Sequence, residues 1–101
     1  MADRLELQSL LEELLGSKNV YYQPPESVKM QYDAIRYSKK QIDVSHADDR
    51  KYSMQDCYEL IVIARRPDHP VIKKLLELSY CRYDRHYVAD NLNHDVLTIY
   101  Y

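Results

Sequence analysis

Five side chains near the carboxyl end of this chain could do chemistry. They are imidazoles and carboxylates, the groups that bind transition metals and move protons in enzymes: Asp84, His86, Asp90, His94 and Asp95. A hairpin over this segment would bring them together around its turn. It would also divide them between the two faces of its strands, and polar groups collect at hairpin ends in any case. We therefore expect neither a metal site nor acid–base catalysis here, and expect His86 and His94 to anchor the turn through hydrogen bonds.

Other catalytic motifs are missing from the sequence. Gly16 is the only glycine, whereas the phosphate-binding loops of dinucleotide and nucleoside-triphosphate enzymes need several. The chain also has no Cys-x-x-Cys pair, no His-Glu-x-x-His motif and no nucleophile-elbow serine. We expect a protein that is not an enzyme and uses no cofactor.

The composition is typical of a soluble globular protein. The 101 residues carry a formal net charge of −2, with 46% hydrophobic and 30% charged residues. This length supports one hydrophobic core, so we expect a single domain over residues 1–101. A dedicated nucleic-acid binder would show a strongly basic surface, so any contact with DNA must be local or indirect.

Two features bear on the compartment. No run approaches the roughly 20 apolar residues of a membrane helix, and residues 1–4 do not begin a signal peptide. We expect a protein that stays in the cytoplasm where it is made, without membrane contact. Cys57 and Cys81 fall inside expected strands and are too few for a disulfide scaffold, so reduced thiols are expected, with a disulfide as the alternative.

Tyrosine supplies all of the aromatic content. The chain has eleven Tyr, no Trp and no Phe. Tyrosine combines a large apolar ring with a hydroxyl that needs a partner, so it suits half-buried strands and interfaces that are wet at one end. Either an ordinary sheet or an interface would use it in this way.

The amino-terminal segment has the pattern of a helix that ends at Gly16. Asp3 and Glu6 have the spacing of a capping box, and Gly16 stands where a left-handed carboxyl-terminal cap is needed. Between them, five leucines at helical spacing form one apolar stripe: Leu7, Leu10, Leu11, Leu14 and Leu15. We interpret the stripe as core, and a partner-binding face is the alternative.

A short strand and a connector follow the first helix. Residues 19–23 contain Val20, Tyr21 and Tyr22, which favour a strand. Pro24 and Pro25 remove two backbone donors and stiffen the chain, so residues 23–30 are expected to form a surface connector.

Two longer strands are expected next. Residues 34–44 alternate, with a bend or bulge at Lys39 and Lys40. A charged turn over residues 46–51 leads to a partner strand over residues 52–64. The unbroken apolar run at its end indicates burial on both faces and a place in the middle of the sheet.

A second helix and a hairpin complete the chain. Residues 69–78 are expected to be helical, with Asp68 as the cap and Pro70 in the first turn. Residues 81–101 are expected to form a β-hairpin, because two strand-like runs flank a turn at residues 89–92. The chain stops on apolar strand residues, so the last strand must be buried in the molecule or covered by a neighbour, and we favour a neighbour.

These elements predict an α+β fold. We expect a mostly antiparallel sheet of about four to five strands, packed by the amino-terminal helix and the second short helix, with the hairpin at the carboxyl end. No internal repeat and no second domain are visible in the sequence.

The chain resembles the small tail-completion proteins of long-tailed bacteriophages, also called tail terminator or minor head-to-tail joining proteins. The resemblance covers most of the chain and is carried by residues 19–25 (Asn-Val-Tyr-Tyr-Gln-Pro-Pro), 34–37 and above all 82–101, which contain Asp-Arg-His-Tyr-Val-Ala-Asp-Asn-Leu-Asn-His-Asp. It implies a virion structural protein at the head–tail junction, made in the host cytoplasm. Its subunits would form a ring, typically six-fold, that caps the tail tube and stops its polymerisation.

The resemblance also implies partners, and with the strand pattern it suggests contact residues. The partners would be other copies of the chain, the tail tube protein and the connector or stopper protein of the head, with DNA passing through the channel without sequence-specific binding. No catalytic residue, metal or cofactor comes with the family. The expected contacts lie on the hairpin and on the loop at residues 45–51: Tyr83, Arg85, Tyr87, Asp90, Asn91, His94, Tyr100, Tyr101, His46, Asp48 and Asp49.

Three other functions remain open at the level of sequence. The chain could be the stopper or adaptor on the head side of the connector, because the resemblance separates these small junction proteins poorly. It could be a regulatory module that presents its first helix to a protein partner. A metal-dependent enzyme using His86 and His94 is the last alternative.

Overall fold

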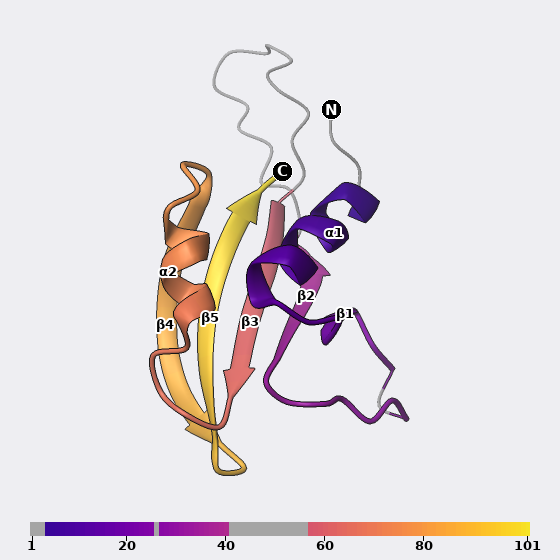
Figure 1. Cartoon of the computed structure of the whole chain (residues 1–101), viewed down its shortest axis with the longest axis vertical. Helices are drawn as coiled ribbons and strands as arrows, with labels where there is room; N and C mark the ends of the chain where they lie inside the picture. Colours follow the sequence, from indigo (N-terminus) through magenta and orange to yellow (C-terminus); the bar gives the residue numbers. More distant parts are fainter. Residues whose placement is uncertain (1–3, 26, 41–56) are drawn as a thin grey trace.

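The chain folds into two helices and five strands, which confirms the expected α+β class (Figure 1). This computed structural model describes residues 4–25, 27–40 and 57–101. In chain order the elements are α1 (Arg4–Leu15), β1 (Val20–Tyr22), β2 (Ala34–Lys39), β3 (Cys57–Ala64), α2 (Pro70–Leu76), β4 (Cys81–Ala89) and β5 (Leu92–Tyr100).

The strands form one sheet in the order β1-β2-β3-β5-β4. β1 pairs parallel with β2, and every other pair is antiparallel. β3 is the central strand, as its apolar run predicted. Both helices lie on the same face of the sheet (Figure 1). No helix of the described residues covers the opposite face, which we call the helix-free face.

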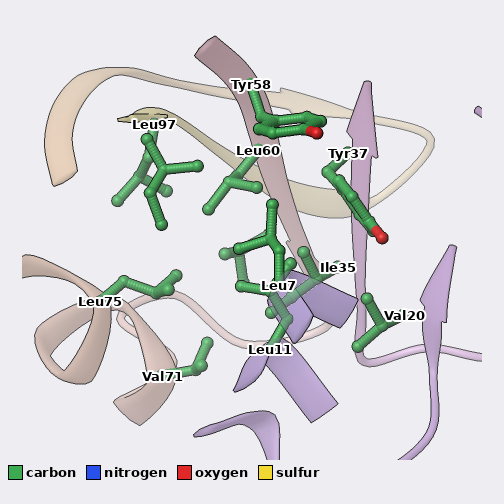
Figure 2. Close-up of a cluster of buried hydrophobic side chains, with 12 residues drawn as sticks. Leu7, Leu11, Val20, Ile35, Tyr37, Tyr58, Leu60, Val71, Leu75 and Leu97 are labelled. Carbon is green, nitrogen blue, oxygen red and sulfur yellow. The ribbon is translucent and has the colours of Figure 1, made fainter. Parts of the chain in front are cut away.

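The core lies between the helices and the sheet (Figure 2). Leu7 and Leu11 of α1 are fully buried, and Leu14 and Leu15 pack partly buried against the same cluster, so these four leucines of the predicted stripe are confirmed as core. Leu10 does not belong to the cluster and lines a surface hollow with Leu5 and Ser9 instead. Val71 and Leu75 of α2 are buried as well. They join inward side chains of four strands in one cluster, which includes Val20, Ile35, Leu60 and Leu97.

Gly16 ends α1 as predicted. Its φ is +82°, in the left-handed region that favours glycine. Its N–H donates to the Glu12 carbonyl at 2.9 Å, which satisfies one of the last free carbonyls of the helix. The predicted cap at Asp3 lies outside the described residues.

The structure has a β-bulge, but in a different strand from the one predicted. Pairing between β2 and β3 runs without a register shift as far as Lys39 and its partner Tyr58, so β2 has no bulge up to its last residue. The shift occurs in β4, between Tyr83 and Arg85. The predicted turn at residues 46–51, and the outer parts of the two strands beside it, fall outside the description.

The cap of α2 is His69 rather than the predicted Asp68. The Nδ1 atom of His69 accepts a hydrogen bond from the Val71 N–H at 3.1 Å. Asp68 has a left-handed backbone, with φ +58°. The residue after it, His69, therefore caps the first turn of the helix. The helix is also shorter than predicted, because it ends at Leu76.

The carboxyl-terminal hairpin is confirmed, but its last strand is covered by its own chain. Asp90 and Asn91 have φ of 52° and 62°, the left-handed pair that a tight two-residue turn requires. β5 inserts between β3 and β4, and its residues Asp95 to Ile99 are buried. The expectation that a neighbour covers this strand was therefore wrong. The exposed strand of the hairpin is β4, because it remains at the edge of the sheet.

Candidate assembly surface

Strand pairing determines which side chains belong to the helix-free face. Leu97 and Ile99 point into the core, so the residues between them in β5 point to the other side. Side chains of paired residues share a face, and these pairings extend across the sheet. The helix-free face therefore includes Arg36, Glu59, Ile61, Arg82, Arg85, Tyr87, His94, Val96, Thr98 and Tyr100.

An arginine, a tyrosine and a histidine stack together on this face. The rings of Tyr87 and His94 are 4.6 Å apart at an interplanar angle of 13°. The guanidinium of Arg85 lies 5.9 Å from the centre of the Tyr87 ring. Tyr87 keeps 38% of its surface exposed. Exposed tyrosine and arginine are the residues that contribute most to protein interfaces, so this Arg–Tyr–His cluster is suited to contact another protein.

A polar chain crosses the helix-free face beside this cluster. Lys40 Nζ donates to Thr98 Oγ1 at 3.1 Å, and the Thr98 hydroxyl donates to Asp84 Oδ2 at 2.5 Å. Arg82 Nε donates to Asp84 Oδ1 at 3.3 Å. Burial alone would raise the pKa of Asp84, but the bonds from Thr98 and Arg82 outweigh it and hold the pKa below its ordinary value. Asp84 is therefore a fixed negative charge next to Arg85.

A buried carboxylate lies on the opposite face of the same two strands. Asp95 Oδ1 accepts a bond from the Tyr83 hydroxyl at 2.7 Å and lies 3.0 Å from His86 Nδ1. The bond to Asp95, together with burial, raises the pKa of Tyr83 to about 12. These contacts tie β4 to β5 through side chains.

The five candidate chemical residues do not converge. Asp84 and His94 lie on the helix-free face, His86 and Asp95 on the helix side, and Asp90 at the tip of the turn. Within the described ranges, no three His, Cys, Asp or Glu side chains are grouped so as to hold a metal ion. His94 does anchor the turn, through Nδ1 at 3.0 Å from the Leu92 carbonyl oxygen, whereas His86 bonds to Asp95 instead.

The outer edge of β4 is the most accessible strand edge. β4 has nine residues, and the seven from Arg82 to Val88 are all exposed. On its outer side it pairs with no other described strand. Val88 is 64% exposed and Tyr83 is 39% exposed. The opposite edge of the sheet is β1, which has three residues.

The predicted contact residues fall into four sets. Arg85, Tyr87 and His94 come together in the Arg–Tyr–His cluster, and Asp90 and Asn91 are exposed at the turn. The others lie apart. Tyr83 is on the helix side, Tyr100 is exposed on the helix-free face, and Tyr101 is half-buried beside Tyr80. His46, Asp48 and Asp49, with the loop at residues 45–51, lie outside the described residues.

Sequence reasoning missed the polar chain and the Asp95 contacts. In the sequence, Thr98 and Asp95 look like ordinary strand residues. The alternation of polar and apolar residues before Ile99 predicts a strand, but it does not predict which residues of other strands these side chains bond to. Their partners depend on the bulge in β4, which sets which residues of β4 face Thr98 and Asp95.

The chain matches no protein-family model, no curated protein and no solved structure in the three comparisons made. Among the described residues, neither helix has the length and apolar character needed to cross a bilayer.

Proposed function

We propose that this protein is a structural subunit that works by associating with copies of itself, as a tail terminator at the head–tail junction of a long-tailed bacteriophage. In that role a ring of subunits caps the tail tube, stops its polymerisation and joins it to the head connector. The observation that carries self-association is the long exposed edge of β4. The phage setting is supported by the resemblance of residues 19–25, 34–37 and 82–101.

An exposed strand edge favours association because its outward N–H and C=O groups lack partners. Soluble monomers usually shorten or cover such an edge. β1 is short, but β4 runs for nine residues and displays Tyr83 and Val88. Any partner that pairs with β4 would also cover the nearby Arg–Tyr–His cluster, which adds aromatic area to the backbone hydrogen bonds.

A ring requires two different surfaces on each subunit, because each copy meets the next through a heterologous contact. The segments that carry the resemblance lie at opposite edges of the sheet: β1 and β2 at one edge, β4 and β5 at the other (Figure 1). A ring in which these two edges meet would use both segments. This arrangement supports a ring over a single face-to-face contact.

The charges suit a channel through which DNA slides. The helix-free face mixes Arg36, Arg82 and Arg85 with Glu59 and Asp84, and the whole chain has a net charge of −2. A strongly basic lumen would hold phosphates. The proposal therefore includes passage of DNA without sequence-specific binding.

Electron microscopy of particles assembled without the protein tests this function. A tail terminator predicts overlong tails or tails that stay unjoined to heads. Heads that leak DNA onto normal tails would instead identify a head-side stopper, and normal joined particles would exclude both roles.

Complementation provides the matched control. Wild-type protein should restore joined tails, and Val88→Asp, which places a charge on the exposed β4 edge, should not. Leu5→Asp should restore them, because Leu5 is equally exposed at 64% but lies on α1, away from β4. Restoration by both variants would show that β4 is not the assembly contact.

A further inference from the structure

Eight of the nine side chains of β4, those from Cys81 to Val88, follow a palindromic order across the two faces of the sheet. Pairing with β5 places four of them on the helix side: Cys81, Tyr83, His86 and Val88. It places the others on the helix-free face: Arg82, Arg85 and Tyr87, with Asp84 joining them at the bulge through its bond to Thr98. Read from either end, the order of faces is the same, and its midpoint lies between Asp84 and Arg85.

This symmetry makes β4 complementary to itself. If two copies pair antiparallel about a two-fold axis at that midpoint, every side chain meets one on its own face. Asp84 of each copy then faces Arg85 of the other, so opposite charges meet twice. Arg82 faces Tyr87, which is a cation–aromatic pair, and Tyr83 faces His86.

The same features oppose pairing with an unrelated strand. A bulge and a row of charges at an edge normally protect a sheet from random association. A regular strand laid along the whole of β4 would lose register at Asp84 and would place no carboxylate opposite Arg85, whereas the three residues of β1 in a ring neighbour are short enough to pair on one side of the bulge. A second copy has its bulge at the same place and puts opposite charges together at the two central Asp84–Arg85 pairs, so it avoids both penalties.

An apolar side of α2 extends this surface beside β4. Lys74 Nζ reaches toward α1, 3.5 Å from the Leu14 carbonyl oxygen. Ile72 and Leu76 project from the opposite side of the helix, given 3.6 residues per turn, and α2 itself packs against β4. Leu76 is 41% exposed. A groove of about 620 Å³ is lined by Pro70, Ile72, Lys73 and Leu76 with Asp68 and His69.

We infer that the free protein forms a two-fold dimer through antiparallel β4–β4 pairing, centred between Asp84 and Arg85. This inference goes beyond the proposed ring, because it concerns the protein before it joins a tail. A copy whose β4 edge is occupied cannot offer that edge to a ring neighbour. The dimer thus keeps the β4 edge covered in the free protein. During assembly the β4–β4 contact would be replaced by the contact with a ring neighbour.

Sedimentation equilibrium of the full chain over micromolar to millimolar concentrations tests the dimer. The expected mass at high concentration is twice the 12.1 kDa of one chain. Arg85→Asp places acidic residues opposite acidic residues at both central pairs, so the dissociation constant should rise on the order of 100-fold. The double variant Asp84→Arg with Arg85→Asp restores opposite charges and should bring the affinity back.

Two controls keep the test decisive. Arg36→Asp makes the same change of charge on the helix-free face but in β2, and should leave the dimer intact. Circular dichroism of each variant establishes that it is folded. A monomer at every concentration, or a dimer that Arg85→Asp leaves unchanged, would overturn the inference. A ring that forms directly from monomers would also overturn the dimer but would leave the proposed function standing. A dimer that never caps a tail would support the inferred dimer and overturn the proposed function.

Discussion

The buried carboxylate of Asp95 accepts a hydrogen bond from the Tyr83 hydroxyl, and this bond keeps the tyrosine protonated well into the alkaline range. The folded pKa of Tyr83 is about 12, against an ordinary value of 10.0. A raised folded pKa means that the stabilisation is complete below pH 10.0 and is lost as pH rises through about 12. The bond therefore contributes fully at neutral pH.

Replacing Asp95 by Asn should lower the pKa of Tyr83 toward 10.0, because the charged acceptor is lost while the size of the side chain is kept. NMR titration of the tyrosine ring carbons measures this shift, and a Tyr83→Phe variant identifies the signal. An unchanged titration of Tyr83 in the Asp95→Asn variant would show that the carboxylate does not hold this proton.

Asp84 predicts a pH dependence of the opposite kind. Its folded pKa lies below the ordinary 3.8, so its contribution is present above pH 3.8 and is lost as pH falls through the folded value. Asp84→Asn should thus be less stable than wild type at neutral pH, and the difference should vanish in strong acid. Thr98→Val should reproduce the effect, because it removes the hydroxyl that donates to Asp84.

Urea denaturation at a series of pH values measures these differences. A gap between wild type and Asp84→Asn that stays constant into strong acid would mean that the carboxylate charge is not what stabilises the fold.

At the scale of single elements, the apolar face of α1 should account for much of the stability. Leu11 is fully buried between α1 and the sheet, so Leu11→Ala should cost about 3 kcal/mol of unfolding free energy through lost burial and a cavity. Leu5→Ala on the exposed side should change it by less than about 0.5 kcal/mol. Chemical denaturation of both variants tests this contrast, and equal losses would contradict the assigned face of the helix.

The hairpin turn can be tested at Asn91. Its φ of 62° suits glycine at least as well as asparagine. Asn91→Gly should therefore keep or slightly raise stability, whereas Asn91→Val should lower it by about 1–2 kcal/mol, because a β-branched residue resists that backbone conformation. Thermal melts of the two variants measure the order. Equal melting temperatures would rule out a left-handed turn at this position.

The elements that the sequence predicted correctly have local signals. The leucine stripe and Gly16 defined α1, and the Asp90–Asn91 pair defined the hairpin turn. The missed features depend on residues far apart in the chain. The bulge in β4 and the insertion of β5 between β3 and β4 are decided by strand pairing, which no local pattern encodes.

The candidate contact residues were likewise predicted correctly only where a local pattern places them. Arg85, Tyr87 and His94 were predicted as contacts and do come together, because alternation along two paired strands places them on one face. Tyr83 and Tyr101 were grouped with them but lie elsewhere. For Tyr83 the cause is the bulge. Tyr83 and Arg85 are two positions apart and would share a face in a regular strand, but the bulge at Asp84 places them on opposite faces.

At the scale of the whole molecule, the sheet is protected unevenly. Two helices cover one face, and the core strands β3 and β5 are paired on both sides. The edge at β4 has no such cover within the described part of the chain. A protein organised in this way offers its neighbours β4 and the adjoining Arg–Tyr–His cluster, and every association described above uses that side of the sheet.

Hydrogen–deuterium exchange of the β4 amides tests this claim most directly. The account predicts that exchange between Arg82 and Val88 slows by at least about 10-fold when the protein is concentrated or bound to tails, because outward amides gain partners. Exchange in β3 should not change, since its amides are already paired on both sides. Rates in β4 that are identical in dilute, concentrated and tail-bound protein would contradict the account.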